Sequence, residues 1–360
     1  MSKKSMHSGF GTVLRAAAAA MLVAGLAAGA AVAQERVYVA NAQDNTLSVI
    51  DPSTNTQVAL GASLVNTLGL AASPDGRRVY VANTNDIAIV DTTINAIIGT
   101  VPAPQRTGAI AVNPNGKLAY TVPPGGAPFL TVLSTGFIPA VVKEVFLNAV
   151  PGGLTLSPDS GRLYITDLFG GSLIVMDTST YRSFAIPVNP FPGYVAAHPD
   201  GARVYVAHAD FDALTVVDFG AGTLTTVPMS NPGELVITPD GSRVYVTNGA
   251  DDTVTAIDAA TNTAVATIPV GDAPQRIAVS ADGAFVYATN QNSDDVSVIS
   301  TATNTVVATV PVGDVPFPVV YVVRRGPGSK GECMNGGWQN FTNPSFNNQG
   351  ECIAFYNSIH

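Results

Sequence analysis

The sequence predicts an all-β fold, a seven-bladed β-propeller of four-stranded antiparallel blades whose ring is closed by the C-terminal strand. Three observations support this: a tyrosine-centred strand recurs seven times, turn signals separate short apolar runs, and the two ends of the chain complement each other. The recurring tyrosines are Tyr38, Tyr80, Tyr120, Tyr164, Tyr205, Tyr245 and Tyr287. They lie 42, 40, 44, 41, 40 and 42 residues apart, and a period near forty with four strands per unit is typical of propeller blades.

The clearest copy of the repeat covers residues 238–276. Pro239-Asp240-Gly241 predicts a tight turn, because proline presets φ and glycine accepts a positive φ. Short runs rich in apolar and β-branched residues flank and follow this turn, as expected of strands. They are 235–237, 244–247, 253–257 and 264–270. Four strands joined by hairpins form one sheet, which is one blade.

The ends of the chain predict how the ring closes. Residues 37–39 form a second strand with no first strand before it, whereas residues 319–322 follow the seventh blade without a turn after them. Pro316 aligns with Pro274 at the start of blade seven. We therefore expect 319–322 to become the innermost strand of blade one, which leaves no open seam in the ring.

The text of the repeat resembles that of the YVTN family of β-propellers, which occur in exported bacterial and archaeal surface proteins. It reads VYVTN in blade six and VYVAN in blades one and two. The resemblance covers residues from about 36 to 323 and implies the propeller fold. It implies no single activity, because related propellers serve as surface modules, lactonase-like enzymes and cofactor carriers.

Residues 1–33 have the features of a secretory signal peptide. A basic start is followed by an alanine-rich apolar run at 16–30 and an A-x-A site at Ala31-Val32-Ala33. An uncleaved membrane anchor is the alternative, but the run is short and weakly hydrophobic for a span. We expect removal of this segment and an exported protein, periplasmic or secreted, with no membrane span after cleavage.

Cleavage would leave 14 basic and 26 acidic residues, a net charge of −12. This argues against nucleic acid as a partner, because nucleic-acid binding needs a basic surface. With 46% hydrophobic and 12% charged residues, the composition fits one large closed domain, which we place at 34–323.

A C-terminal module is predicted at 332–360, after a linker at 324–331. It contains the two cysteines of the sequence, Cys333 and Cys352. In an exported protein such a pair predicts a disulfide, whereas two soft ligands are too few for a metal site. The segment also resembles a short cysteine-bracketed module at the C-terminus of assorted exported bacterial proteins, a resemblance that implies no activity.

By analogy with other propellers, we sought a site at the mouth of the axial channel. Seven equivalent residues lie immediately before the predicted first strands: Gly69, Ala109, Gly153, Tyr194, Glu234, Arg276 and Pro318. Tyr194, Glu234 and Arg276 come from adjacent blades and could orient a polar ligand, with the arginine binding a carboxylate or phosphate. Alternatively, Glu234 and Arg276 form a plain ion pair between blades.

A second candidate site lies in blades four and five, within the irregular sector formed by blades three to five. Phe169, Phe191 and Phe211 fall on the same face of the disc, near His208. They could form an apolar patch for a partner or ligand, or each could simply cover its own hairpin. His208 is also the single histidine placed to serve as an axial haem ligand.

Two sets of aspartates complete the inventory of candidates. Those between second and third strands could gather calcium or be only solvated: Asp44, Asp251, Asp252, Asp294 and Asp295. Others recur before a turn in five blades and indicate a scaffold role: Asp51, Asp91, Asp177, Asp218 and Asp258. The sequence contains no nucleophile-elbow, zinc-protease or phosphate-loop motif.

These observations favour an exported propeller that acts as a binding or protein-interaction module, with an unidentified protein or small ligand as its partner. The alternative is an enzyme or redox-cofactor protein with a site at the channel mouth, for which a lactonase-like hydrolase is the first hypothesis. The sequence assigns neither catalytic residues nor a cofactor.

Overall fold

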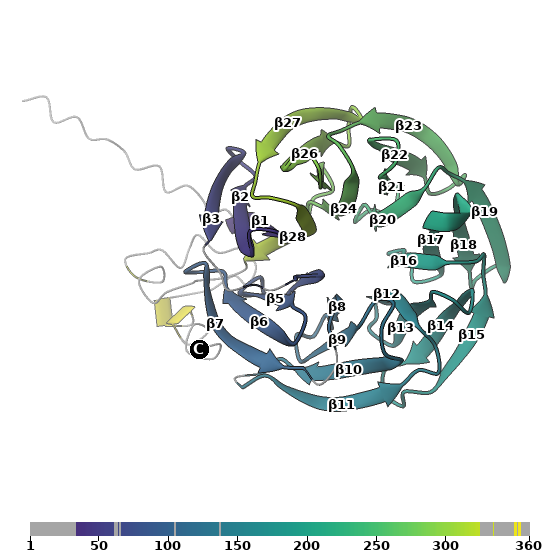
Figure 1. The fold of residues 1–360 in the computed structure, drawn as a ribbon, viewed down its shortest axis with the longest axis horizontal. Helices are drawn as coiled ribbons and strands as arrows, with labels where there is room; N and C mark the ends of the chain where they lie inside the picture. The colour runs from purple at the N-terminus through teal and green to yellow at the C-terminus, as the bar shows by residue number, and fades with distance from the viewer. Residues whose placement is uncertain are drawn as a thin grey trace, which may run out of the picture.

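The computed structural model describes residues 34–60, 64, 66–103, 106–136, 138–324, 334, 349, 350, 352 and 353. Within them, seven four-stranded antiparallel sheets stand around a central axis (Figure 1). The predicted seven-bladed propeller is therefore confirmed. In this part of the chain, no helix is long and apolar enough to cross a membrane. The predicted signal peptide at 1–33 lies outside the described residues.

Each blade runs from an innermost first strand to an outermost fourth strand. Blades one to three contain β28 (Pro316–Arg324), β1 (Gln34–Asn41), β2 (Thr46–Asp51), β3 (Thr56–Leu60); β4 (Gly69–Ala72), β5 (Arg78–Ala82), β6 (Asp86–Asp91), β7 (Ala96–Pro102); and β8 (Ala109–Val112), β9 (Leu118–Val122), β10 (Phe129–Ser134), β11 (Ala140–Phe146). Blades four and five contain β12 (Pro151–Leu156), β13 (Arg162–Asp167), β14 (Ser172–Asp177), β15 (Ser183–Pro187); and β16 (Pro192–Ala197), β17 (Arg203–His208), β18 (Ala213–Asp218), β19 (Thr223–Pro228), with a short 3₁₀ helix, η1 (Ala209–Phe211), after β17. Blades six and seven contain β20 (Pro232–Ile237), β21 (Arg243–Asn248), β22 (Thr253–Asp258), β23 (Thr263–Pro269); and β24 (Pro274–Val279), β25 (Phe285–Asn290), β26 (Asp295–Ser300), β27 (Thr305–Pro311).

The ring closes as the sequence predicts, because β28 pairs with β1 in antiparallel register. Val319 lies opposite Val39, and Tyr321 lies opposite Val37. The first strand of blade one thus comes from the C-terminal end of the propeller, and the other three come from its start. This arrangement pairs the innermost strand of blade one and leaves no gap between blades one and seven (Figure 1).

The hydrophobic core lies between neighbouring blades rather than within any one of them. Tyr245 of β21, for example, packs with Ile277 of β24 and Val286 of β25, and all three are buried. The tyrosine hydroxyl also reaches the next blade, where it donates to Asn304 Oδ1 at 2.8 Å. Tyr205 makes the same bond to Asn262 at 3.1 Å. The recurring tyrosine therefore joins adjacent blades both by packing and by a hydrogen bond.

The recurring aspartate before the turn between the third and fourth strands has the predicted scaffold role. In blade six, Asp258 Oδ1 accepts hydrogen bonds from the amides of Ala260 and Thr261, at 3.0 and 3.1 Å. These amide contacts hold the pKa of the Asp258 carboxyl below its usual value. Equivalent bonds occur at the other four positions, Asp51, Asp91, Asp177 and Asp218.

The first strands of several blades begin earlier than the sequence suggested, and this changes the setting of the candidate residues. In blade six, β20 starts at Pro232, and its pairing with β21 shifts register between Pro232 and Leu235. Glu234 thus lies inside the strand, at a β-bulge, and not before it. Arg276 has the same position in β24. Because a bulge redirects side chains locally, it can turn these two toward the axis.

Candidate functional site

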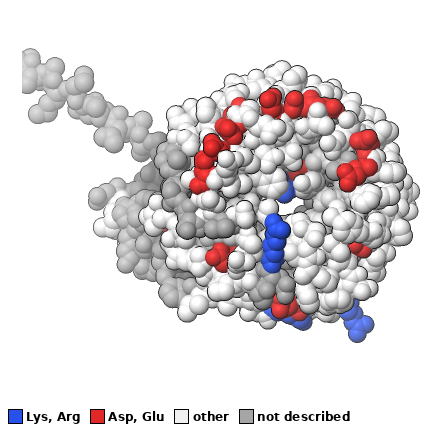
Figure 2. Space-filling view, viewed as in Figure 1, with Lys and Arg blue, Asp and Glu red and all other residues white. Residues whose placement is uncertain are grey.

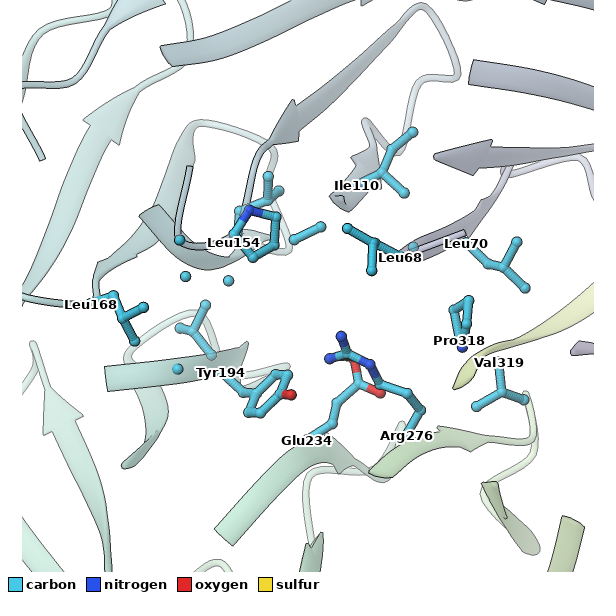
Figure 3. A pocket seen from close by; sticks show the side chains of 18 residues that line it. Leu68, Leu70, Ile110, Leu154, Leu168, Tyr194, Glu234, Arg276, Pro318 and Val319 are labelled. Atoms are coloured by element: carbon cyan, nitrogen blue, oxygen red, sulfur yellow. Dashed lines mark ion pairs between the residues drawn. The ribbon is translucent and has the colours of Figure 1, made fainter. Parts of the chain in front are cut away.

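All seven equivalent residues selected from the sequence line a single cavity of about 390 Å³ at the centre of the ring. The side chains of Tyr194, Glu234 and Arg276 reach toward the cavity from three adjacent blades (Figure 3). Among the described residues that line the cavity, Glu234 and Arg276 are the two that carry a charge, and Tyr194 adds a hydroxyl. The structure therefore brings these seven positions together, and their role as a ligand-binding site stays a prediction.

Buried threonines on the second strands fix the bulges that carry the charged residues. In blade six, Thr247 Oγ1 lies 3.3 Å from the carbonyl oxygens of both Glu234 and Gln275. In blade seven, Thr289 Oγ1 lies 3.0 Å from the carbonyl oxygen of Phe317 in β28. Each threonine therefore ties a bulge to the first strand of the following blade. Sequence reasoning missed this role of the threonines.

Arg276 is held between two aromatic rings. Its guanidinium carbon is 4.7 Å from the centre of the Tyr194 ring and 4.2 Å from that of Phe317, which is cation–π geometry. Its side chain is 12% exposed, and its buried Nε has no hydrogen-bond partner among the described residues. A buried arginine nitrogen without an acceptor is costly, and the two ring contacts offset part of that cost.

Glu234 contacts Arg276 without forming a hydrogen bond to it. Arg276 Nη1 and Glu234 Oε1 are 3.8 Å apart, which exceeds hydrogen-bonding distance. The other carboxylate oxygen, Oε2, accepts the amide hydrogen of Ile277 at 3.0 Å. Burial raises the pKa of the Glu234 carboxyl, although Arg276 and the Ile277 amide oppose this shift. One oxygen is thus anchored, and the other faces the cavity, where the side chain is 33% exposed.

The opposite wall of the cavity is apolar, and sequence reasoning missed it. Figure 3 shows Leu68, Leu70, Ile110, Leu154 and Leu168 across the cavity from the charged pair. Most of these residues belong to or flank first strands. Leu168, however, comes from the connection between β13 and β14 in blade four, within the irregular sector of blades three to five. That irregularity was the one signal from which this part of the wall could have been found.

The second candidate site does not reach the cavity. Phe169, Phe191 and Phe211 are 68%, 42% and 48% exposed, the first two in loops and the third at the end of η1. The described cavity lining includes none of them. His208 is fully buried, with Nδ1 3.1 Å from the Pro190 carbonyl and Nε2 2.9 Å from Thr215 Oγ1. Burial lowers its pKa. Both ring nitrogens are therefore occupied, and the residue has none free for a haem iron.

The acidic connections have a structural role that the sequence did not suggest. Asp252 Oδ1 accepts the amide hydrogen of Ala273, and Asp294 Oδ1 accepts that of Val315, both at 2.8 Å. These bonds join one blade to the turn that enters the next. Among the described residues, no group of three or more His, Cys, Asp and Glu side chains could hold a metal ion.

The predicted disulfide involves a cysteine outside the described residues. Cys352 is described and buried, whereas Cys333 lies outside the described residues. The pairing of the two cysteines, and the separation of 332–360 as a module, stay predictions.

Comparisons with known proteins agree with the fold. A family model described as "Lactonase, 7-bladed beta-propeller" matches residues 204–323, from β17 to the closing strand. No curated protein matches the chain.

Similar solved structures come from proteins with different descriptions. A periplasmic gluconolactonase from Pseudomonas aeruginosa is 20% identical, with a TM-score of 0.66 over 80% of this chain and 99% of that one. Hydrazine synthase from Kuenenia stuttgartiensis is also 20% identical, with a TM-score of 0.66 over 78% and 99%. A functionally unknown protein from Desulfotomaculum acetoxidans is 15% identical, with a TM-score of 0.69 over 80% and 99%. Identities this low establish a shared fold alone.

Proposed function

We propose that the protein is an exported hydrolase that opens lactones at the channel mouth, with Glu234 as general base and Arg276 as the group that stabilises the oxyanion. The observation that carries the proposal is the convergence of these two charged side chains in one cavity whose other described lining is largely apolar. The partial family match and the gluconolactonase neighbour support the enzyme hypothesis. These comparisons lend no support to the alternative that the sequence favours, a binding or protein-interaction module.

The chemistry needs one base and one cluster of donors. Glu234 Oε1 takes a proton from water, and the water oxygen attacks the lactone carbonyl carbon. The carbonyl oxygen becomes an oxyanion, to which the N–H groups of Arg276 donate. The ring C–O bond then breaks, and the leaving ring oxygen takes the proton from Glu234. The product is a hydroxy acid, and the carboxylate is restored.

Three features of the site suit these roles. The raised pKa of Glu234 makes its carboxylate a stronger base. The 3.8 Å separation leaves room for N–H groups of Arg276 to bind a substrate instead of the glutamate. The two aromatic rings fix the guanidinium plane, so that little reorganisation is needed when charge develops.

The test is lactone hydrolysis by the purified protein, followed by acid release in a pH-stat with δ-gluconolactone, γ-butyrolactone and γ-decalactone. We expect Arg276→Gln to lower kcat/KM by about 10² to 10³ and Glu234→Gln to lower it by about 10² to 10⁴. The control is Arg243→Gln, which breaks the 2.7 Å ion pair with Asp258 outside the cavity and should leave hydrolysis unchanged. Wild-type protein that hydrolyses none of the three lactones would contradict the proposal, as would full activity in both channel variants.

A further inference from the structure

We propose that the site selects lactones that carry a hydrocarbon substituent, and that it discriminates against sugar and sugar-phosphate lactones. The inference rests on the proposed function, because it names the substrate class of the same cavity. The observation behind it is the apolar wall opposite Glu234 and Arg276. Lactone hydrolysis by a general base and an oxyanion site does not by itself require such a wall.

Two leucines of this wall serve the cavity and not the core. Leu70, Ile110 and Leu154 pack against core clusters between blades. Among the described core clusters, none includes Leu68 or Leu168, yet both line the cavity. Apolar side chains that remain partly open at a concave site are typical of ligand-binding surfaces.

The wall is also preformed, because backbone hydrogen bonds hold its irregular loops. The Leu168 amide donates to the Val150 carbonyl, and the Gly125 amide donates to the Pro151 carbonyl, each at 2.8 Å. Both acceptors belong to the entry into blade four. The connections of blades three and four thereby reach the cavity lining through Pro124, Gly125 and Leu168. No connection between second and third strands in the other blades contributes a described lining residue.

The charge inside the cavity does not suit a phosphorylated sugar. Arg276 is the single basic residue in the described cavity lining, and it is needed at the reacting carbonyl. Arg106 precedes β8 on the same face but is exposed and does not line the cavity. Figure 2 shows acidic side chains in an arc over the blades of this face, and a basic side chain nearer the central opening. A phosphate inside the cavity would compete with the reacting carbonyl for Arg276.

A polyhydroxylated ring also finds few side-chain partners in this cavity. Among the described lining side chains, Tyr194, Glu234 and Arg276 are the ones that can hydrogen-bond, and the last two act at the ester. Burying sugar hydroxyls against leucines would leave them unpaired, which is unfavourable. A volume of about 390 Å³ is at the small end of ligand sites, which suits one lactone ring with a short to medium chain.

The experiment compares kcat/KM for γ-butyrolactone, γ-hexalactone, γ-octalactone, γ-decalactone, δ-gluconolactone and 6-phosphogluconolactone. We expect about a threefold to fourfold rise for each methylene that reaches the wall, and lower values for both sugar lactones than for γ-octalactone. Leu168→Asn and Leu68→Asn should flatten the dependence on chain length. Leu224→Asn is the matched control, because Leu224 is exposed on the outermost strand β19, and it should leave the series unchanged.

The outcomes separate this inference from the proposed function. Hydrolysis that is independent of chain length, or fastest with a sugar lactone, overturns the inference and leaves the hydrolase proposal intact. If no lactone is hydrolysed, calorimetric binding of the hydroxy-acid anions 4-hydroxybutyrate to 4-hydroxydecanoate decides. If affinity rises with chain length and Leu168→Asn weakens that rise, the protein binds the proposed ligand class without hydrolysing it. If affinity does not depend on chain length, both the ligand class and the hydrolase proposal are wrong.

Discussion

The two walls of the channel mouth differ in the residues that the first strands present to the axis and in what the connections between strands add. On the side of blades five to seven, bulges inside the first strands present Tyr194, Glu234 and Arg276 to the axis. On the side of blades two to four, apolar first strands are supplemented by connections that depart from the repeat, which add Pro124 and Leu168.

This contrast shows where a repeat protein can change without losing its fold. The buried tyrosines and the aspartates of the outer turns recur because each joins or shapes blades. The bulge position and the connection between second and third strands both reach the axis while carrying little of the interblade core. Variation at these two points gives one face of a repetitive ring a polar wall and an apolar wall.

The largest effect should follow from removing the closed ring on which both walls depend. A chain truncated before Pro316 loses β28, which pairs with β1, carries Pro318 to the cavity and packs Phe317 against the Arg276 guanidinium. We expect loss of cooperative unfolding, a destabilisation of at least about 5 kcal/mol, comparable to the stability of a whole domain. Circular dichroism during a thermal melt measures this.

The matched control for this truncation ends after Arg324 and keeps β28 complete. It should retain a single cooperative transition. A chain without β28 that melts cooperatively at the same temperature as the control would show that closure contributes little, and that each wall is stable within its own half of the ring.

How far the sequence predicts this molecule follows from which features repeat. Seven copies of the tyrosine strand predicted the blades, and the unmatched ends predicted that 319–322 would close the ring, because copies can be compared with one another. The bulge that places Glu234 inside β20 was missed, since a shift of register depends on pairing with β21. Leu168 was missed because a connection that occurs in one blade has no second copy to compare it with.

A smaller effect should distinguish residues that position the polar wall from residues that only join blades. Thr247→Val removes the hydroxyl that contacts the carbonyl oxygens of Glu234 and Gln275. Loss of this hydrogen bonding should cost about 1 kcal/mol of unfolding free energy. It should also lower kcat/KM about tenfold, because small displacements of a catalytic group are costly. Urea unfolding and lactone hydrolysis provide the two measurements.

Thr166→Val is the control for that variant. Thr166 accepts from the Gly153 amide at 2.7 Å and contacts the Gly193 carbonyl oxygen at 3.2 Å, so it joins blades four and five but touches no charged residue. We expect a similar loss of stability and activity within about twofold of wild type. Equal losses of activity in both variants would mean that the threonines act only through blade packing.

The smallest effect concerns the loss of folding stability that the buried Glu234 carboxylate causes. Burial raises the pKa of Glu234 above its ordinary value of 4.5, against the opposing effects of Arg276 and the Ile277 amide. The unfolded chain therefore releases this proton at lower pH than the folded protein does, so the ionised side chain destabilises the fold increasingly as pH rises from 4.5 through the raised pKa.

The Glu234→Gln variant removes that penalty. Its melting temperature should equal that of wild type near pH 4 and exceed it by a growing margin toward neutral pH, while activity is lost. A variant less stable than wild type at pH 7 to 8 would show that the contact with Arg276 outweighs burial, and that the pair is a plain ion pair between blades six and seven.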